Sequence, residues 1–252
     1  MILYEYPLNE RIRTYLRLGH LFERLEQLIQ RDSALDHHFA LMTLFELLET
    51  TNRTDLKPDA LKDLDRQKKQ IEAWRGNPAI SESMLNAVLA QMQECSAQLG
   101  ALRGKPGSDL LERHEWLKTL RNRSSIPGGS CEFDVPVYYA WQRRPAALRR
   151  ADIQKWVAPL IPLAHTIKLL LHILRDSGQP QKVIANGGHF QQMLPPGSTF
   201  QLLRLNIDEN CGLVPEISAN RMLIAVRLLR PQPDGSLKPD SSEQTLELAL
   251  CA

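Results

Sequence analysis

Cysteines are few in this sequence, and none of them are closely spaced. The 252 residues contain four cysteines, with no Cys-x-x-Cys pair: Cys95, Cys131, Cys211 and Cys251. Such scattered thiols form neither a disulfide framework nor the usual structural zinc site. The cysteine usage therefore indicates a protein of a reducing cytoplasm.

Long apolar runs are also missing. The most apolar region, residues 156–174, is interrupted by Pro159 and Pro162 and carries Lys168. A membrane-spanning helix needs about 20 consecutive apolar residues, and a signal peptide needs an apolar stretch that the charged N-terminus does not provide. We therefore expect neither a targeting segment nor a membrane contact.

Net charge is small. The chain has 31 basic and 29 acidic residues, a formal charge of +2 at pH 7. A protein built as a polycation for nucleic acid is therefore not indicated, and any electrostatic function must come from local patches.

Motifs of common enzymes and cofactor sites are absent from the sequence. It has no G-x-x-x-x-G-K-[ST] loop, no G-x-G-x-x-G turn and no H-E-x-x-H pair. His37 and His38 are adjacent, so on a helix they face about 100° apart and do not form a metal pair. We expect no enzyme, no cofactor and no metal. One enzymatic alternative is a nucleophilic thiolate at Cys131, although a structural cysteine in a tight turn is the simpler interpretation.

The sequence predicts an α+β fold whose first and larger part is a mainly helical domain, residues 9–178. Apolar residues spaced by three and four predict a packed helix from residue 9 to about residue 30. Similar stripes predict helices near 41–48, 61–71 and 81–95, the last capped by Ser81. Ser108 is expected to cap a further helix through Leu120, and a long helical stretch at 136–176 is expected to break near its prolines.

Short apolar runs bounded by turn residues predict a β-domain at 180–252. These runs lie at 182–185, 200–207, 221–229 and 245–250. No helical connection separates them, so the sheet should be antiparallel, with residues 1–7 adding an N-terminal strand. Within the helical domain, residues 124–136 are expected to form a short turn and strand insertion, in which Gly128 and Gly129 are both expected to adopt backbone angles that only glycine tolerates.

Arginines gather in two places. Between residues 113 and 155 the sequence has nine basic and four acidic residues, which leaves a nucleic-acid-binding module as an alternative. In the run 221–229, strand alternation places Arg221, Leu223, Ala225 and Arg227 on one face, with Met222, Ile224, Val226 and Leu228 toward the core. Two outward guanidiniums suit an acidic partner, because guanidinium binds carboxylates through two parallel hydrogen bonds.

Several blocks of sequence resemble the ZapD family of bacterial cell-division proteins. They include Pro-Leu-Asn-Glu at 7–10, Lys-Asp-Leu-Asp-Arg-Gln at 62–67 and Ser-Ile-Pro-Gly-Gly at 125–129. Weaker blocks are Leu-Arg-Leu-Asn at 203–206 and Pro-Glu-Ile-Ser at 215–218. They follow the family order and cover nearly the whole chain.

The resemblance implies cell division and septation rather than catalysis. Family members are cytoplasmic homodimers that bind FtsZ, the tubulin-like GTPase of the mid-cell division ring, and bundle its protofilaments during Z-ring assembly. Their basic residues receive the C-terminal tail of FtsZ. The apolar stripe at 15–29 and the one at 160–174 are both candidates for the dimer seam.

The resemblance also implies tail-binding residues. Arg53 and Arg227 match basic family positions, and the family has an arginine where this chain has Leu223. Arg221, expected on the same strand face, is a candidate to substitute for it. Three further arginines, within or beside the matching blocks, complete the predicted site: Arg17, Arg121 and Arg123.

Overall fold

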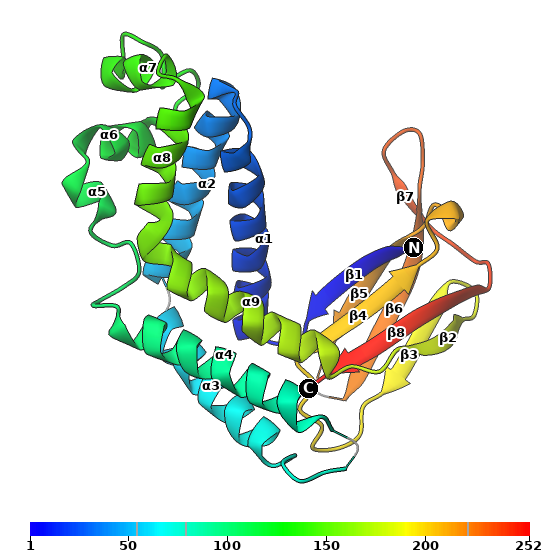
Figure 1. The fold of residues 1–252 in the computed structure, drawn as a ribbon. Helices are drawn as coiled ribbons and strands as arrows, with labels where there is room; N and C mark the ends of the chain where they lie inside the picture. The colour runs from blue at the N-terminus through cyan, green and yellow to red at the C-terminus, as the bar shows by residue number, and fades with distance from the viewer. Residues whose placement is uncertain (54, 79, 221) are drawn as a thin grey trace. The chain divides into compact units, whose positions relative to one another are not determined.

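The computed structural model describes residues 1–53, 55–78, 80–220 and 222–252, except for the side chain of residue 53. The chain divides into two compact units. The β unit consists of Met1–Leu16 and Leu171–Ala252, and the helical unit is Arg17–Leu170. The helices, and the strands that come mainly from the C-terminal part, confirm the predicted α+β fold (Figure 1).

The predicted apolar stripes are the buried faces of helices. In α1, Tyr15, Leu18, Leu25 and Ile29 are buried, and Phe22 is half-buried. The start of α1 is capped by Asn9, whose Oδ1 accepts from the backbone N–H of Ile12 at 2.9 Å. The elements in chain order are α1 (Glu10–Gln30), α2 (Ala34–Arg53), α3 (Leu56–Glu72), α4 (Glu82–Ala101), α5 (Leu110–Arg113), α6 (Glu115–Arg123), α7 (Pro136–Gln142), α8 (Ala146–Val157), η1 (Ala158–Leu160) and α9 (Ile161–Asp176).

Helix α4 begins where the sequence predicts. Ser81 is its N-cap, and the Ser81 hydroxyl accepts from the backbone N–H of Met84 at 3.5 Å. The helix expected to run through Leu120 is instead two helices, because His114 between α5 and α6 has the non-helical angles φ −131° and ψ 87°. Residues 131–134 form turns, so the alternating pattern there does not make a strand.

Prolines divide the long helical stretch as predicted. Pro145 precedes α8, and the short 3-10 helix η1 contains Pro159. By length and composition alone, residues 146–176 could cross a membrane. Buried core helices meet the same criterion, and here Ile153, Leu163 and Ile167 are buried within the protein.

An aromatic cluster joins the three helices α6, α7 and α8. Trp116, Trp141 and Trp156 have ring centroids 5.5–5.9 Å apart, and Tyr138 lies 6.0 Å from Trp141. Burying such large rings stabilises the packing by about 1.5–3 kcal/mol for each side chain. The cluster fixes the positions of the segments on either side of the turn at 124–134.

The strands of the β unit form two antiparallel sheets rather than one. Sheet A has the order β1-β4-β8-β2, and sheet B has the order β3-β6-β5 with β7 also paired to β6. The N-terminal strand is confirmed, since β1 pairs with β4 from Ile2 opposite Ile207 to Pro7 opposite Leu202. The strands are β1 (Ile2–Pro7), β2 (Gln181–Ala185), β3 (His189–Met193), β4 (Leu202–Ile207), β5 (Val214–Ala219), β6 (Leu223–Pro231), β7 (Leu237–Pro239) and β8 (Gln244–Cys251).

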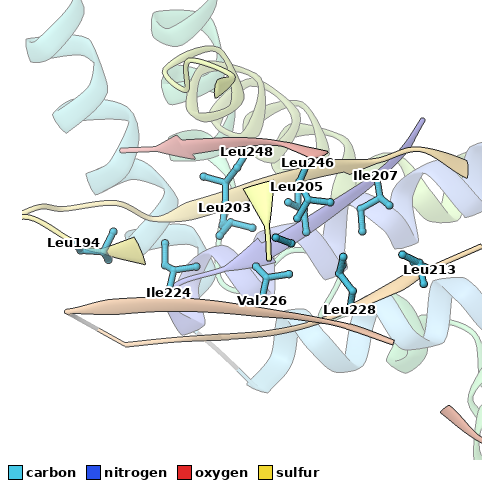
Figure 2. Packing of buried hydrophobic residues seen from close by; sticks show 11 residues of the cluster. Leu194, Leu203, Leu205, Ile207, Leu213, Ile224, Val226, Leu228, Leu246 and Leu248 are labelled. Atoms are coloured by element: carbon cyan, nitrogen blue, oxygen red, sulfur yellow. The ribbon is translucent and has the colours of Figure 1, made fainter. Parts of the chain in front are cut away.

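The two sheets pack face to face around a leucine-rich core. Leu203 and Leu205 of β4 and Leu246 and Leu248 of β8 point toward Ile224, Val226 and Leu228 of β6 (Figure 2). This arrangement confirms the predicted inward face of β6 except at Met222, which precedes the strand and is 66% exposed. Because side chains alternate between the two faces of a strand, the residues of β6 between the core-facing ones lie on the outer surface of sheet B.

Candidate partner-binding surface

Arg227 lies at the centre of the outer face of sheet B. In the register of the sheet it is opposite His189 of β3 on one side and Glu216 of β5 on the other. Its Nη2 is 2.7 Å from Oε2 of Glu216. The guanidinium is therefore outward, as the strand pattern predicts, and it is ion-paired across the strand.

Uncharged side chains continue this face along the strands from the charged row. Ala225 is opposite Gln191 and Ser218, and Leu223 is opposite Met193, which is largely exposed. A guanidinium beside such residues can bind a carboxylate of a peptide while the methionine and leucine contact its apolar parts. We name this surface the Arg227 face, defined by His189, Gln191, Met193, Glu216, Ser218, Leu223, Ala225 and Arg227.

Part of the predicted basic pair lies outside the described residues. Arg221 is one of the residues that the structure does not describe, so its proposed substitution for the family arginine stays a prediction. Leu223, which occupies that family position, is half-buried on the Arg227 face. An arginine at position 223 would therefore share a face with Arg227.

The other predicted tail-binding residues belong to the helical unit. Arg53 is the last residue of α2, and its side chain is outside the described part of the chain. Arg17 is exposed on α1, and Arg121 is exposed near the end of α6. Arg227, in contrast, is in the β unit.

Arg121 lines an open hollow beside α2. The hollow has a volume of about 740 Å³, and its α2 wall includes Glu46, Glu49 and Asn52. Glu46 is paired with Arg24, whose Nη2 lies 2.5 Å from Oε1. The structure thus brings Arg121 beside the helix that ends at Arg53, in a hollow that also contains the carboxylates of Glu46 and Glu49.

Arg123 holds the Ser-Ile-Pro-Gly-Gly turn together. Its guanidinium forms an ion pair with Asp134, and its Nε donates to the carbonyl of Gly129 at 3.1 Å. Gly128 has the positive φ of 70° expected for it. The same expectation for Gly129 is wrong, because its φ is not positive; what requires glycine there is space, since a Cβ would lie 2.7 Å from the carbonyl oxygen of Arg123.

These two glycines should therefore respond differently to substitution. We expect Gly129→Ala to lower the free energy of unfolding by about 1–3 kcal/mol, because its methyl group would overlap the backbone of the turn. Gly128→Asn should cost less, since asparagine tolerates a positive φ and a Cβ there meets nothing nearer than 3.9 Å. Denaturant unfolding of both variants tests this order, and equal losses would contradict it.

Most of the basic residues between 113 and 155 are bound within the helical unit. Arg143 donates to the hydroxyl of Tyr139 at 2.8 Å, and Arg149 is buried. Four others form ion pairs with aspartates: Arg113 with Asp109, Arg123 with Asp134, Arg144 with Asp152 and Arg150 with Asp32. Six of the nine basic residues of this segment are therefore engaged by other groups of the helical unit.

Arg149 has a structural role that the sequence did not indicate. It donates to the carbonyl of Asp32 at 2.6 Å, to that of Gln142 at 3.1 Å and to that of Arg144, and its Nε donates to Nδ1 of His37 at 3.0 Å. Burial, together with the charges of Arg149 and the neighbouring Arg150, lowers the pKa of His37. The neutral imidazole is thus the form that accepts from Arg149.

A second arginine group, around Glu5 of sheet A, is also internally paired. Arg175 binds Glu5 through two hydrogen bonds of 2.8 and 2.7 Å, and Nε of Arg204 lies 3.3 Å from the same carboxylate. Side chains that are engaged in this way are less accessible to a partner than Arg227. The alternation pattern does not distinguish Arg204 from Arg227, since both lie between apolar residues.

Comparisons with known proteins give a consistent result. The family model ZapD, described as a cell division protein, matches residues 16–227. Proteins named cell division protein ZapD from Ralstonia pickettii (strain 12J) and Ralstonia nicotianae are 49% and 48% identical over 252 residues, covering 100% of this chain and 99% of each relative. The protein of that name from Janthinobacterium sp. (strain Marseille) is 48% identical over the full length of both chains.

Proposed function

The chain belongs to the ZapD family of cell division proteins, and on that basis we propose that it binds FtsZ directly and crosslinks its protofilaments. The proposed contact is the C-terminal tail of FtsZ. In this proposal the protein is a cytoplasmic homodimer that acts at the mid-cell division site and promotes Z-ring assembly. The relatives are named as division proteins rather than as an enzyme, so a role in division is the common ground.

The observation that carries the proposal is the exposed guanidinium of Arg227. It is outward on sheet B, on a face that also carries the apolar side chains of Leu223 and Met193 further along the strands, which suits a partly apolar, acidic peptide. An arginine that is both buried and bound to carbonyls, such as Arg149, cannot receive a peptide without loss of internal bonds. We therefore assign the tail contact to the Arg227 face, with the helical-unit arginines 17, 53, 121 and 123 and with Arg221 as further candidates.

A homodimer explains how one small chain could bundle filaments. With one tail site in each subunit, a dimer bridges two protofilaments, and two weak sites bound together give a higher avidity than either alone. The nucleic-acid alternative has less support, because four of the nine basic residues between 113 and 155 are ion-paired with aspartates of this chain, and Arg143 and Arg149 are bound to other groups in it.

Cosedimentation with FtsZ tests the proposal. We expect the protein to pellet with GTP-assembled FtsZ and to be released when free tail peptide is added, because the peptide occupies the same site. The bridging step also requires a mass about twice 28.7 kDa in sedimentation equilibrium. Pelleting that the peptide does not reduce, or a monomer at micromolar concentration, would contradict the proposal.

A further inference from the structure

The carboxylate of Glu216 occupies the position that a carboxylate of an acidic partner would need. Glu216 and Arg227 are directly opposite each other on β5 and β6, and both point outward. Their side chains are 57% and 45% exposed, and the ion-pair distance is 2.7 Å. The guanidinium on which the partner contact depends is therefore already bound within the same sheet.

The Glu216–Arg227 ion pair is strong enough to compete with a carboxylate of a partner, and weak enough for that carboxylate to displace Glu216. Exposed ion pairs contribute about 0.2–1 kcal/mol. Glu216 contacts Nη2 of Arg227, a nitrogen that a carboxylate of a peptide would also use in a two-bond contact, and its negative charge lies beside that contact. The opposite neighbour, His189, provides no competing carboxylate. Glu216 is thus the group on the Arg227 face that both engages the guanidinium and repels an incoming anion.

We propose that Glu216 is an intramolecular competitor that limits the affinity of the Arg227 face for acidic peptides. This inference rests on the proposed function and concerns its regulation. Binding of a peptide carboxylate exchanges one ion pair for another, so the net gain is small and each single contact is weak. Weak single contacts suit a crosslinker whose avidity for filaments comes from two linked sites.

The test compares Glu216→Gln with Glu247→Gln. Both variants remove one negative charge from the β unit, but Glu247 is on the outer face of sheet A, where it accepts from Asn206 at 3.0 Å, a bond that the glutamine carbonyl can keep. We expect Glu216→Gln to bind a labelled FtsZ tail peptide about two- to fivefold more tightly than the wild type. Glu247→Gln should bind like the wild type.

A double substitution separates direct competition from general repulsion. In an Arg227→Gln background, Glu216→Gln should give little or no gain, because the guanidinium that it would release is gone. An equal gain in both backgrounds, or a loss of affinity in the Glu216→Gln single variant, would overturn the inference. If instead Arg227→Gln alone binds like the wild type, the tail site itself is assigned wrongly, and the failure is that of the proposed function.

Discussion

Reversing Arg227 to glutamate is expected to lower the affinity for the FtsZ tail at least tenfold, about 1.4 kcal/mol. The substitution replaces an attractive group by one that repels the tail carboxylates, beside the carboxylate of Glu216. Losing a charge-assisted contact costs about 2–5 kcal/mol when it is buried and less at an exposed rim. Binding of a labelled tail peptide measures the effect, and added salt should weaken wild-type binding for the same reason.

Arg75→Glu is the matched control for this variant. The side chain of Arg75 is 52% exposed, a fraction similar to the 45% of Arg227. Arg75 is also ion-paired, with Glu82 at 3.4 Å, in the helical unit. The change in net charge is the same, so a general charge effect would weaken both variants equally. Arg227→Glu that remains folded and binds like the wild type would place the site elsewhere, with Arg121 and its hollow as the next candidate.

Replacing Arg149 by methionine is expected to lower the free energy of unfolding by about 3–5 kcal/mol. The guanidinium binds three carbonyls and the imidazole of His37, and it is 5% exposed. Methionine fills much of the volume but donates no hydrogen bonds, and each buried acceptor left unsatisfied costs about 1–3 kcal/mol. Chemical denaturation followed by tryptophan fluorescence measures the loss, since the cluster of Trp116, Trp141 and Trp156 is in the same unit.

The control for Arg149 is Arg143→Met. Arg143 is exposed and contacts only the ring and hydroxyl of Tyr139 among the interactions described for it. Its loss should cost less than about 1 kcal/mol. Arg149 bonds to Asp32, just after α1, and to Gln142, at the end of α7. Equal free energies of unfolding for the two variants would show that these bonds do not stabilise the helical unit.

Periodicity predicted the fold well where one face of an element is buried. The stripes of α1 and α4 and, except at Met222, the inward face of β6 follow from spacing, and the residue type of Ser81 predicts the cap of α4. The strand β3 was missed because it is short and mostly polar, and β5 was missed because it is short and contains Pro215. They become strands by pairing with β6, a long-range partner that local pattern does not reveal.

The candidate site was less predictable than the fold. Strand alternation placed Arg227 outward, but no pattern in the sequence indicates that Glu216 is opposite it, because register depends on the pairing of β5 with β6. Likewise, Arg123 and Arg149 are ordinary members of a basic segment in the sequence. Only the fold shows that Arg123 binds the turn at Gly129 and that Arg149 binds backbone carbonyls such as that of Asp32.

Site-specific photo-crosslinking tests most directly whether the Arg227 face receives the tail. A photoreactive residue at Ser218 would be on that face, two residues along β5 from Glu216, whereas one at Thr245 would be on the outer face of sheet A. Both positions are exposed and in the same unit. We expect the FtsZ tail peptide to crosslink at Ser218 and not at Thr245. Efficient crosslinking at Thr245 with none at Ser218 would contradict the assignment.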